Sequence, residues 1–265
     1  MLFDTHAHYD SSWFRDDREE VLSALPSQGV GLVLNPGCEL DSSRSAVEYA
    51  RRYDHVYAAV GVHPSDCNDF CEGTVAELRK LALENPKVRA IGEIGLDYYW
   101  KEYPDREWQK QVLFRQMALA QELDLPVILH DREAHADCLQ AVKEFPGVRG
   151  VFHCYSGSLE DAKTLIKLGW NLSFTGSITY KNAKKALEVV KWVPAGRYMI
   201  ETDSPYMLPY PRQKGEKRND SAKVRRVAEC IAALRGMSVE EVARETWETG
   251  CAFFGIDRPW QEERP

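Results

Sequence analysis

The sequence predicts a (β/α)8 TIM barrel, and three features support this fold class. Short apolar runs alternate with longer amphipathic stretches, the alternation repeats eight times, and the apolar runs are rich in β-branched and aromatic residues. This pattern is typical of a parallel sheet covered by helices. The length of 265 residues also suits one such barrel, which has about 250 residues. We therefore expect a single domain spanning residues 1–265.

The apolar runs are expected to form buried parallel strands because they are short and rich in β-branched and aromatic residues. In chain order they cover residues 2–3, 30–34, 56–60, 88–91, 126–129, 148–152, 170–174 and 197–200. Apolar residues at helical spacing predict helices between and after them. These helices cover residues 18–25, 41–53, 74–84, 107–123, 134–145, 159–168, 182–190, 221–235 and 238–253. Thr74 with Glu77 and Ser238 with Glu241 resemble capping boxes at two helix starts.

Composition and charge exclude several classes of protein. Hydrophobic residues make up 44% and charged residues 28% of the chain, which indicates a folded protein rather than a disordered one. A net charge of −7 argues against a broad basic face for duplex DNA. Seven cysteines without a CxxC pair predict free thiols in a reducing compartment. No apolar run reaches the roughly 20 residues of a membrane span, so we expect a cytoplasmic protein.

Residues suited to metal binding follow several of the predicted strands. In barrels the carboxyl ends of the strands carry the active site, so residues far apart in sequence become neighbours there. In chain order the residues are His6, His8, His63, Glu93, His130, His153 and Asp203. The sequence therefore predicts one metal centre at this end of the barrel.

His6 and His8 lie two residues apart at the end of the first strand. Residues i and i+2 of a strand point to the same face, so both imidazoles can bind one ion. Neutral imidazole suits zinc, manganese, iron or nickel. The alternative is two surface histidines at the end of an edge strand. Ligand-type residues after the other strands favour the metal.

Glu93 lies between two glycines, Gly92 and Gly95, which permit close approach of the backbone. A buried carboxylate needs a cationic partner, either an arginine at the rim or a pair of metal ions that it bridges. His130 and His153 are each interpretable as core histidines, but together with the first pair they predict a ligand set. Asp203 is predicted to bind metal and to accept a proton from the attacking water. Glu93 and Asp203 are thus the candidate catalytic residues.

Flanking residues complete the predicted site. Asp4 and Glu201 are expected to orient the ring N–H groups of the ligands. A cluster after Glu93 is either a packed hydrophobic loop or a stacking platform for a flat substrate; it contains Tyr98, Tyr99, Trp100, Tyr103 and Trp108. A basic stretch after the last strand is either a solvated surface or a phosphate contact; it contains Arg212, Lys214, Lys217 and Arg218.

These motifs together are similar to those of a known family. In order they are Asp4-Thr5-His6-Ala7-His8, Gly61-Val62-His63-Pro64, Gly92-Glu93-Ile94-Gly95-Leu96-Asp97, His130 with Arg132, His153-Cys154-Tyr155-Ser156-Gly157 and Glu201-Thr202-Asp203-Ser204-Pro205. The sequence resembles, over essentially its whole length, the TatD family of metal-dependent deoxyribonucleases in the amidohydrolase-like barrel superfamily. One stretch departs from the family, which commonly has Arg-Asn-Glu-Pro or Asn-Gln-Pro where this chain has Arg218-Asn219-Asp220-Ser221: the asparagine is kept, the acid is shorter and the proline is absent.

The resemblance implies two divalent ions, drawn from magnesium, manganese, zinc and nickel, and no organic cofactor. The ligands of one ion would be His6, His8, Glu93 and Asp203, and those of the second Glu93, His130 and His153. Together with the basic stretch, the resemblance predicts substrate contacts from His63, Arg132, Tyr155, Arg212, Lys214 and Asn219. The fold expected from it is an amidohydrolase-like barrel, regular or distorted.

The sequence therefore predicts a metal-dependent hydrolase that cleaves DNA phosphodiester bonds with an activated water. The resemblance implies a 3′–5′ exonuclease that acts on DNA. An acidic chain suits single strands or ends better than the middle of a duplex. One alternative is an amidohydrolase-like enzyme for a small ester, lactone or phosphoester, since fold and ligands alone do not separate the two. Another is a metal-binding protein without enzymatic activity.

Overall fold

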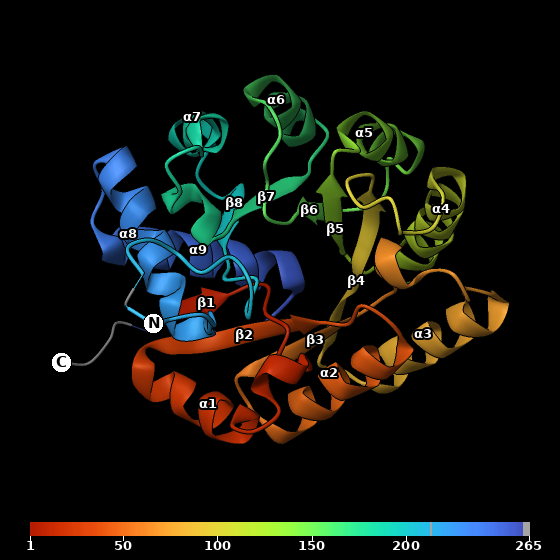
Figure 1. Cartoon of the computed structure of the whole chain (residues 1–265), viewed down its shortest axis with the longest axis horizontal. Helices are drawn as coiled ribbons and strands as arrows, with labels where there is room; N and C mark the ends of the chain where they lie inside the picture. Colours follow the sequence, from red (N-terminus) through yellow and green to blue (C-terminus); the bar gives the residue numbers. More distant parts are fainter. Residues whose placement is uncertain (213, 262–265) are drawn as a thin grey trace. The chain divides into compact units, whose positions relative to one another are not determined.

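The computed structural model describes residues 1–212 and 214–261. It contains an eight-stranded sheet in the order β1 to β8, with helices between the strands (Figure 1). The paired strands are parallel. The first and last strands are neighbours as well, because Thr5 N donates to Ile200 O at 3.2 Å and Ala7 forms a parallel bridge with Ser204. This is the connectivity of a (β/α)8 barrel, and the predicted fold class is confirmed.

All eight predicted strands are present. They are β1 (Leu2–Asp4), β2 (Val30–Pro36), β3 (Val56–Val60), β4 (Val88–Asp97), β5 (Val127–Arg132), β6 (Gly150–Phe152), β7 (Asn171–Phe174) and β8 (Tyr198–Ile200). The helices are α1 (Arg18–Ala24), α2 (Leu40–Arg52), α3 (Glu72–Glu84), α4 (Arg106–Leu123), α5 (His135–Glu144), α6 (Leu159–Lys167), α7 (Lys184–Trp192), α8 (Val224–Arg235) and α9 (Val239–Phe254). The predicted bounds differ from these by a few residues at most sites.

Two elements, β4 and α3, differ from the sequence prediction. β4 continues to Asp97 rather than ending at Ile91, so Glu93 lies inside the strand and not after it. The capping box of α3 uses Cys71 and Thr74, which corrects the predicted pair of Thr74 and Glu77. The thiol of Cys71 takes the place that a hydroxyl usually fills, and this moves the helix start to Glu72. The Ser238–Glu241 box of α9 is confirmed.

The chain separates into two compact units. The first contains Met1–Asn35, Cys154–Thr164 and the described part of 171–265, and the second contains Pro36–His153 and Leu165–Trp170. β1, β7 and β8 belong to the first unit, and β3 to β6 belong to the second. The single domain expected from the sequence stays a prediction.

In the first unit, α9 packs behind β1. The ring of Phe3 lies 6.2 Å from that of Trp247 and 6.0 Å from that of Phe254. Gly250 allows this approach, since a Cβ at that position would lie 2.8 Å from the Phe3 ring. The burial of Phe3 therefore fixes the strand that leads into His6 and His8.

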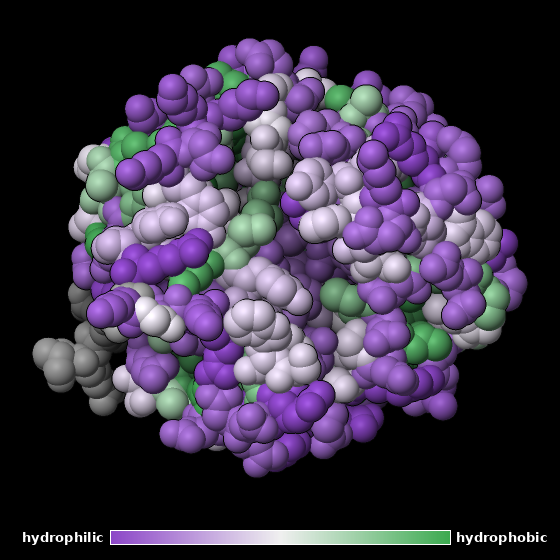
Figure 2. Space-filling model, in the orientation of Figure 1, coloured by the Kyte–Doolittle hydropathy of each residue, from purple (hydrophilic) through white to green (hydrophobic). Residues whose placement is uncertain are grey.

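The surface and the helices agree with the composition. The face seen in Figure 2 is mostly hydrophilic. Among the helices of the described residues, none is long and apolar enough to cross a membrane. All seven cysteines are free, as the irregular spacing predicts.

In the second unit, the packing of Trp170 against β6 gives a test of the core. A Cβ on Gly150 would lie 2.1 Å from Trp170 Cζ3, and Trp170 is 1% exposed. We expect Gly150→Ala to lower the free energy of unfolding by about 1–3 kcal/mol through overpacking. Urea unfolding of the metal-free protein measures it.

Gly147→Ala is the matched control, because the nearest atom to its Cβ is the mobile amide of Gln121 at 3.3 Å. Equal stability of the two variants would contradict this account of the β6 core.

Candidate metal centre

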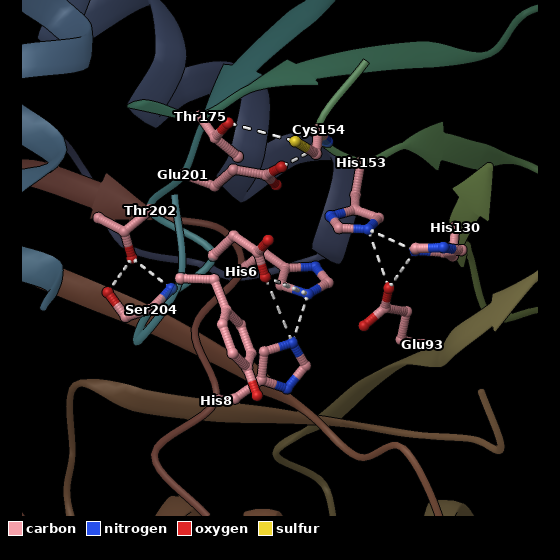
Figure 3. A network of polar contacts seen from close by, with 12 residues as sticks. His6, His8, Glu93, His130, His153, Cys154, Thr175, Glu201, Thr202 and Ser204 are labelled. Atoms are coloured by element: carbon pink, nitrogen blue, oxygen red, sulfur yellow. Dashed lines mark hydrogen bonds and ion pairs between the residues drawn. The ribbon is translucent and has the colours of Figure 1, made fainter. Parts of the chain in front are cut away.

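The first cluster of candidate ligands belongs to the first unit and consists of His6, His8 and Asp203. The segments after β1 and β8 run side by side, because Asp203 N donates to His6 O at 2.9 Å and His8 N donates to Ser204 O at 2.7 Å. The imidazoles of His6 and His8 are turned toward one another (Figure 3). Asp203 Oδ1 lies 3.8 Å from His6 Nε2 and 3.5 Å from His8 Nε2. The three side chains thus converge on one point.

The spacing in this cluster fits a metal ion. The two Nε2 atoms are 3.0 Å apart and both rings are buried. Two imidazole lone pairs at this distance repel, and a cation between them removes the repulsion. Ligand atoms that each lie 2.0–2.1 Å from one ion are separated by about 3.0–3.4 Å. The donor set of two nitrogens and one carboxylate is one that divalent transition metals accept.

Asp4 holds the loop that carries Asp203. Its Oδ1 accepts from Thr202 N at 2.8 Å and its Oδ2 accepts from Thr202 Oγ1 at 2.5 Å. Asp4 Oδ1 also accepts from His6 N at 3.3 Å, so the contacts of Asp4 are with hydroxyl and backbone N–H groups. The predicted role of Asp4 in orienting a ring N–H stays a prediction. Burial raises the pKa of Asp4 to about 7.

Asp203 itself has unusual backbone geometry. Its φ is 56°, in the left-handed region that non-glycine residues rarely adopt. Such strain persists only where surrounding contacts hold it. Here the hydrogen bonds of Thr202 to Asp4 supply those contacts on the residue directly before it.

The second cluster belongs to the second unit and consists of Glu93, His130 and His153. Glu93 Oε1 lies 2.9 Å from His130 Nδ1 and 2.9 Å from His153 Nε2. The two ring nitrogens are 3.2 Å apart, and Figure 3 shows all three groups pointing toward one another. These separations also match those of ligands around one ion.

The glycines around Glu93 make this cluster possible. Gly95 pairs with His130 in the β4–β5 register, and a Cβ on it would lie 2.0 Å from His130 O. A Cβ on Gly92 would lie 2.7 Å from Ile128 Cβ. The absence of side chains at both positions brings β4 and β5 close enough for Glu93 to reach His130.

Asp97 is a site residue that the sequence analysis left out. Its Oδ2 lies 3.2 Å from His130 Nε2, so neutral His130 donates from Nε2 and directs its Nδ1 lone pair toward Glu93 and His153. Burial disfavours the charged forms of both the His130 imidazole and the Asp97 carboxyl. The hydrogen bond between them, together with other nearby hydrogen bonds and opposite charges, outweighs burial, so the pKa of His130 is raised and that of Asp97 is lowered. A signal was present, because Asp97 ends the same strand four residues after Glu93.

His63 and Cys38 lie beside the second cluster. His63 Nε2 is 3.7 Å from Glu93 Oε1, and its ring is 4.4 Å from the ring of His130. Burial lowers the pKa of His63 to about 3, and the nearby His130 contributes in the same direction, so the imidazole of His63 is neutral. Cys38 Sγ lies 3.9 Å from Glu93 Oε2; the sequence gave no sign of it, because no second cysteine stands nearby in the chain. The role of His63 in substrate binding stays a prediction.

Glu201 organises the turn that follows His153. Its Oε1 accepts from Cys154 N at 2.6 Å and its Oε2 accepts from Ser173 Oγ at 2.7 Å. Cys154 has a φ of 46°, so Glu201 stabilises a second strained residue next to a candidate ligand. The predicted orienting role of Glu201 toward a ring N–H stays a prediction.

Two predicted substrate contacts are buried and hydrogen-bonded within the protein. Tyr155 is 4% exposed and its hydroxyl donates to Ser158 O at 2.7 Å. Asn219 is fully buried and its Nδ2 donates to Thr202 O and Tyr206 O. Both side chains help to hold loops, and their contacts with substrate stay predictions.

The other predicted contacts lie on the surface or near it. Arg212 and Lys214 are exposed, and the guanidinium of Arg212 lies 4.7 Å from the ring centre of Tyr210. Arg218 is bound instead to the carboxylate of Asp17, at 2.7 and 2.6 Å. Contacts of Arg132, Arg212 and Lys214 with substrate stay predictions.

Comparison with known proteins identifies the family of the chain. Residues 3–255 match the family described as TatD related DNase. The chain belongs to the TatD family. Its relatives include an uncharacterized metal-dependent hydrolase, YabD, of Bacillus subtilis (strain 168), which is 42% identical over 97% of this chain and 100% of that protein. The protein is a metal-dependent hydrolase, as the sequence predicts.

Two further TatD-family relatives are informative. The protein named 3'-5' ssDNA/RNA exonuclease TatD of Erwinia amylovora is 34% identical over 96% of this chain and 100% of its own. The crystal structure of YJJV, a TatD homolog from Escherichia coli K12, matches with a TM-score of 0.89 and 31% identity, over 96% of this chain and 98% of that one. The (β/α)8 fold is thus shared with a solved member of the TatD family.

The contact between Asp97 and His130 generates a test of the second cluster. We expect Asp97→Asn to weaken metal binding there by about 10- to 100-fold, the usual cost of removing the carboxylate that orients a ligand histidine. Calorimetric titration of the metal-free protein with Mn²⁺ or Zn²⁺ measures it.

Asp131→Asn is the matched control. Asp131 stands one residue from His130 and is similarly buried, but its Oδ2 contacts His135 Nδ1 at 2.6 Å. If both variants lose metal affinity equally, the orienting role of Asp97 is wrong.

Proposed function

We propose that this hydrolase is a deoxyribonuclease that removes nucleotides from the 3′ end of single strands or frayed ends. The observation that carries the proposal is the pair of three-ligand clusters. In the first, the two ring nitrogens are 3.0 Å apart and Asp203 Oδ1 lies 3.5 and 3.8 Å from them, and in the second the three donor atoms lie 2.9–3.2 Å apart. Paired divalent ions are widely used to cleave phosphodiesters. The activity named for the Erwinia amylovora relative supports the choice of substrate.

The proposed cofactors are two divalent cations, one per cluster. His6, His8 and Asp203 would hold one ion, and Glu93, His130 and His153 the other. We propose that Glu93 is shared by both ions, as the family resemblance implies. When bound, the ions would supply Lewis acidity that makes a water acidic and neutralises charge on phosphate oxygens. Imidazole nitrogens suit zinc, manganese or nickel, and magnesium is compatible with the carboxylates.

The protein's own residues divide the remaining work. Asp203 would accept the proton of the attacking water, because its carboxylate stands beside His6 and His8. His63, held neutral by burial, would meet the substrate next to Glu93. Arg132, Arg212 and Lys214 would contact phosphates of the bound strand.

The proton-accepting role of Asp203 gives one prediction. Asp203→Asn keeps the shape and one oxygen ligand, so we expect kcat to fall by about 10²–10⁴, the range for a general base. Binding of a single-stranded oligonucleotide should change far less. Single-turnover kinetics and binding titrations separate the two effects.

Asp220→Asn is the control, because Asp220 caps the short helix at Ser221–Lys223 and pairs with Lys223. A variant Asp203→Asn that binds weakly but reacts at the normal rate once bound would refute the role of the base. Assays of a lactone and a phosphotriester beside DNA test the alternative substrates.

The shared ligand gives another prediction. We expect the wild-type protein to bind two ions and Glu93→Gln to lose at least one, together with most of its turnover, because an amide bridges two cations poorly. Metal content by mass spectrometry and DNA hydrolysis are measured on the same samples. Glu102→Gln, on the exposed loop after β4, controls for the charge change. Unaltered stoichiometry with normal activity would exclude the shared ligand.

A further inference from the structure

The aromatic residues that follow Glu93 separate into two groups in the structure. Tyr98 is held in place, because its hydroxyl donates to Asp137 Oδ2 at 2.7 Å. Trp108 is held as well, since its Nε1 donates to Cys67 O at 2.7 Å. Tyr99 and Trp100, in contrast, are 46% and 41% exposed. The interpretation as a packed hydrophobic loop therefore accounts for the first group and not for the second.

The two exposed rings form an ordered arrangement with an arginine. Tyr99 and Trp100 meet edge to face, with ring centres 4.8 Å apart and planes at 89°. The guanidinium of Arg132 lies 4.1 Å from the ring centre of Tyr99 and 5.4 Å from that of Trp100. The arrangement combines exposed π surface with a fixed cation, which are the two components of single-strand binding sites.

Asp97 ties this arrangement to the second metal cluster. Its Oδ1 accepts from Tyr99 N at 2.9 Å, while its Oδ2 contacts His130 Nε2. Asp97 also pairs with Arg132 in the β4–β5 register. One carboxylate therefore holds the backbone of Tyr99 next to a candidate metal ligand.

A row of rings leads from the cluster to Trp100. His63, beside Glu93, lies 6.4 Å from the ring of Tyr103, and Tyr103 lies 6.4 Å from the ring of Trp100. All these residues belong to the second unit. Two ring-to-ring steps thus lead from His63, beside Glu93, to the exposed ring of Trp100.

We propose that Tyr99, Trp100 and Arg132 form a stacking subsite for an unpaired nucleobase of the substrate strand. The inference rests on the proposed nuclease function. Trp100 supplies the stacking surface, and Arg132 supplies the cation for the neighbouring phosphate. A base within a duplex is already stacked and paired, so the subsite selects single strands and frayed ends. Because every base has a π face, it selects without regard to sequence.

The test compares oligonucleotides that carry one abasic site at successive positions from the 3′ end. In the wild-type protein, an abasic nucleotide at the subsite should lower kcat/KM by about 5- to 150-fold, the fold-change that stacking of one base gives. Trp100→Ala should cause a similar loss on the intact oligonucleotide and little further loss on the abasic one. An oligonucleotide in which every nucleotide is abasic has phosphodiester bonds but no flat ring, and it should be hydrolysed equally by both proteins.

Two control variants accompany it. Trp100→Phe keeps an aromatic face and should retain most of the activity on DNA. Trp192→Ala, at the end of α7, removes a partly exposed indole elsewhere and should leave the abasic profile unchanged. Equal effects of Trp100→Ala on intact, abasic and base-free substrates would overturn the subsite.

Binding separates failure of the subsite from failure of the proposed function. Anisotropy of a labelled oligonucleotide is measured with the metal-loaded protein and the same abasic series. Binding that depends on Trp100 and on the base, without DNA hydrolysis, would support the subsite while contradicting the nuclease. Hydrolysis without dependence on the base would contradict the subsite alone, and absence of both binding and hydrolysis would contradict both.

Discussion

The site depends on one constraint: buried ligand atoms held about 3 Å apart repel unless a cation or a proton lies among them. His6 Nε2 and His8 Nε2 are 3.0 Å apart, and His130 Nδ1 and His153 Nε2 are 3.2 Å apart. A protein that holds such groups together in its interior must supply the holding force elsewhere. Many contacts around the strand ends hold these ligand atoms together. Metal binding would then remove the repulsion between them and so stabilise the folded protein.

The holding force comes from carboxylates that touch no candidate ion. Asp4 accepts a hydrogen bond from Thr202 N, directly before Asp203. Glu201 accepts one from Cys154 N, directly after His153. Asp97 contacts Nε2 of His130, the ring nitrogen that points away from Glu93. Two of the three stand next to a backbone with positive φ, at Asp203 and at Cys154. Each carboxylate therefore stabilises a local conformation that the chain would otherwise leave. The same arrangement explains why Asp4 is buried deeply enough for its pKa to rise to about 7.

The fold and the residues of the two clusters could be predicted from the sequence, because both follow from patterns along the chain. Apolar runs give the strands, and the residues that follow them, such as His6 and His153, are set by position. Side-chain direction is not recorded in this way. Tyr155 and Asn219 stand in the right motifs but turn inward to hold loops, and Asp97 was left out because its use depends on the ring of His130. The strand β4 is longer than predicted because it contains Gly92 and Gly95, and glycines usually indicate the end of a strand.

The charge of the protein bears on how it can hold a polyanion. A net charge of −7 gives no general attraction to nucleic acid, so affinity has to come from local groups. Bound divalent ions would reverse the charge at the ligand clusters, and Arg132 adds a cation at a fixed place. Stacking on Tyr99 and Trp100 requires no positive charge at all. An acidic enzyme that combines few phosphate contacts with stacking would hold its substrate near the metals. It would gain little affinity for the remainder of a long duplex, because phosphate contacts supply almost all of the non-specific binding to duplexes.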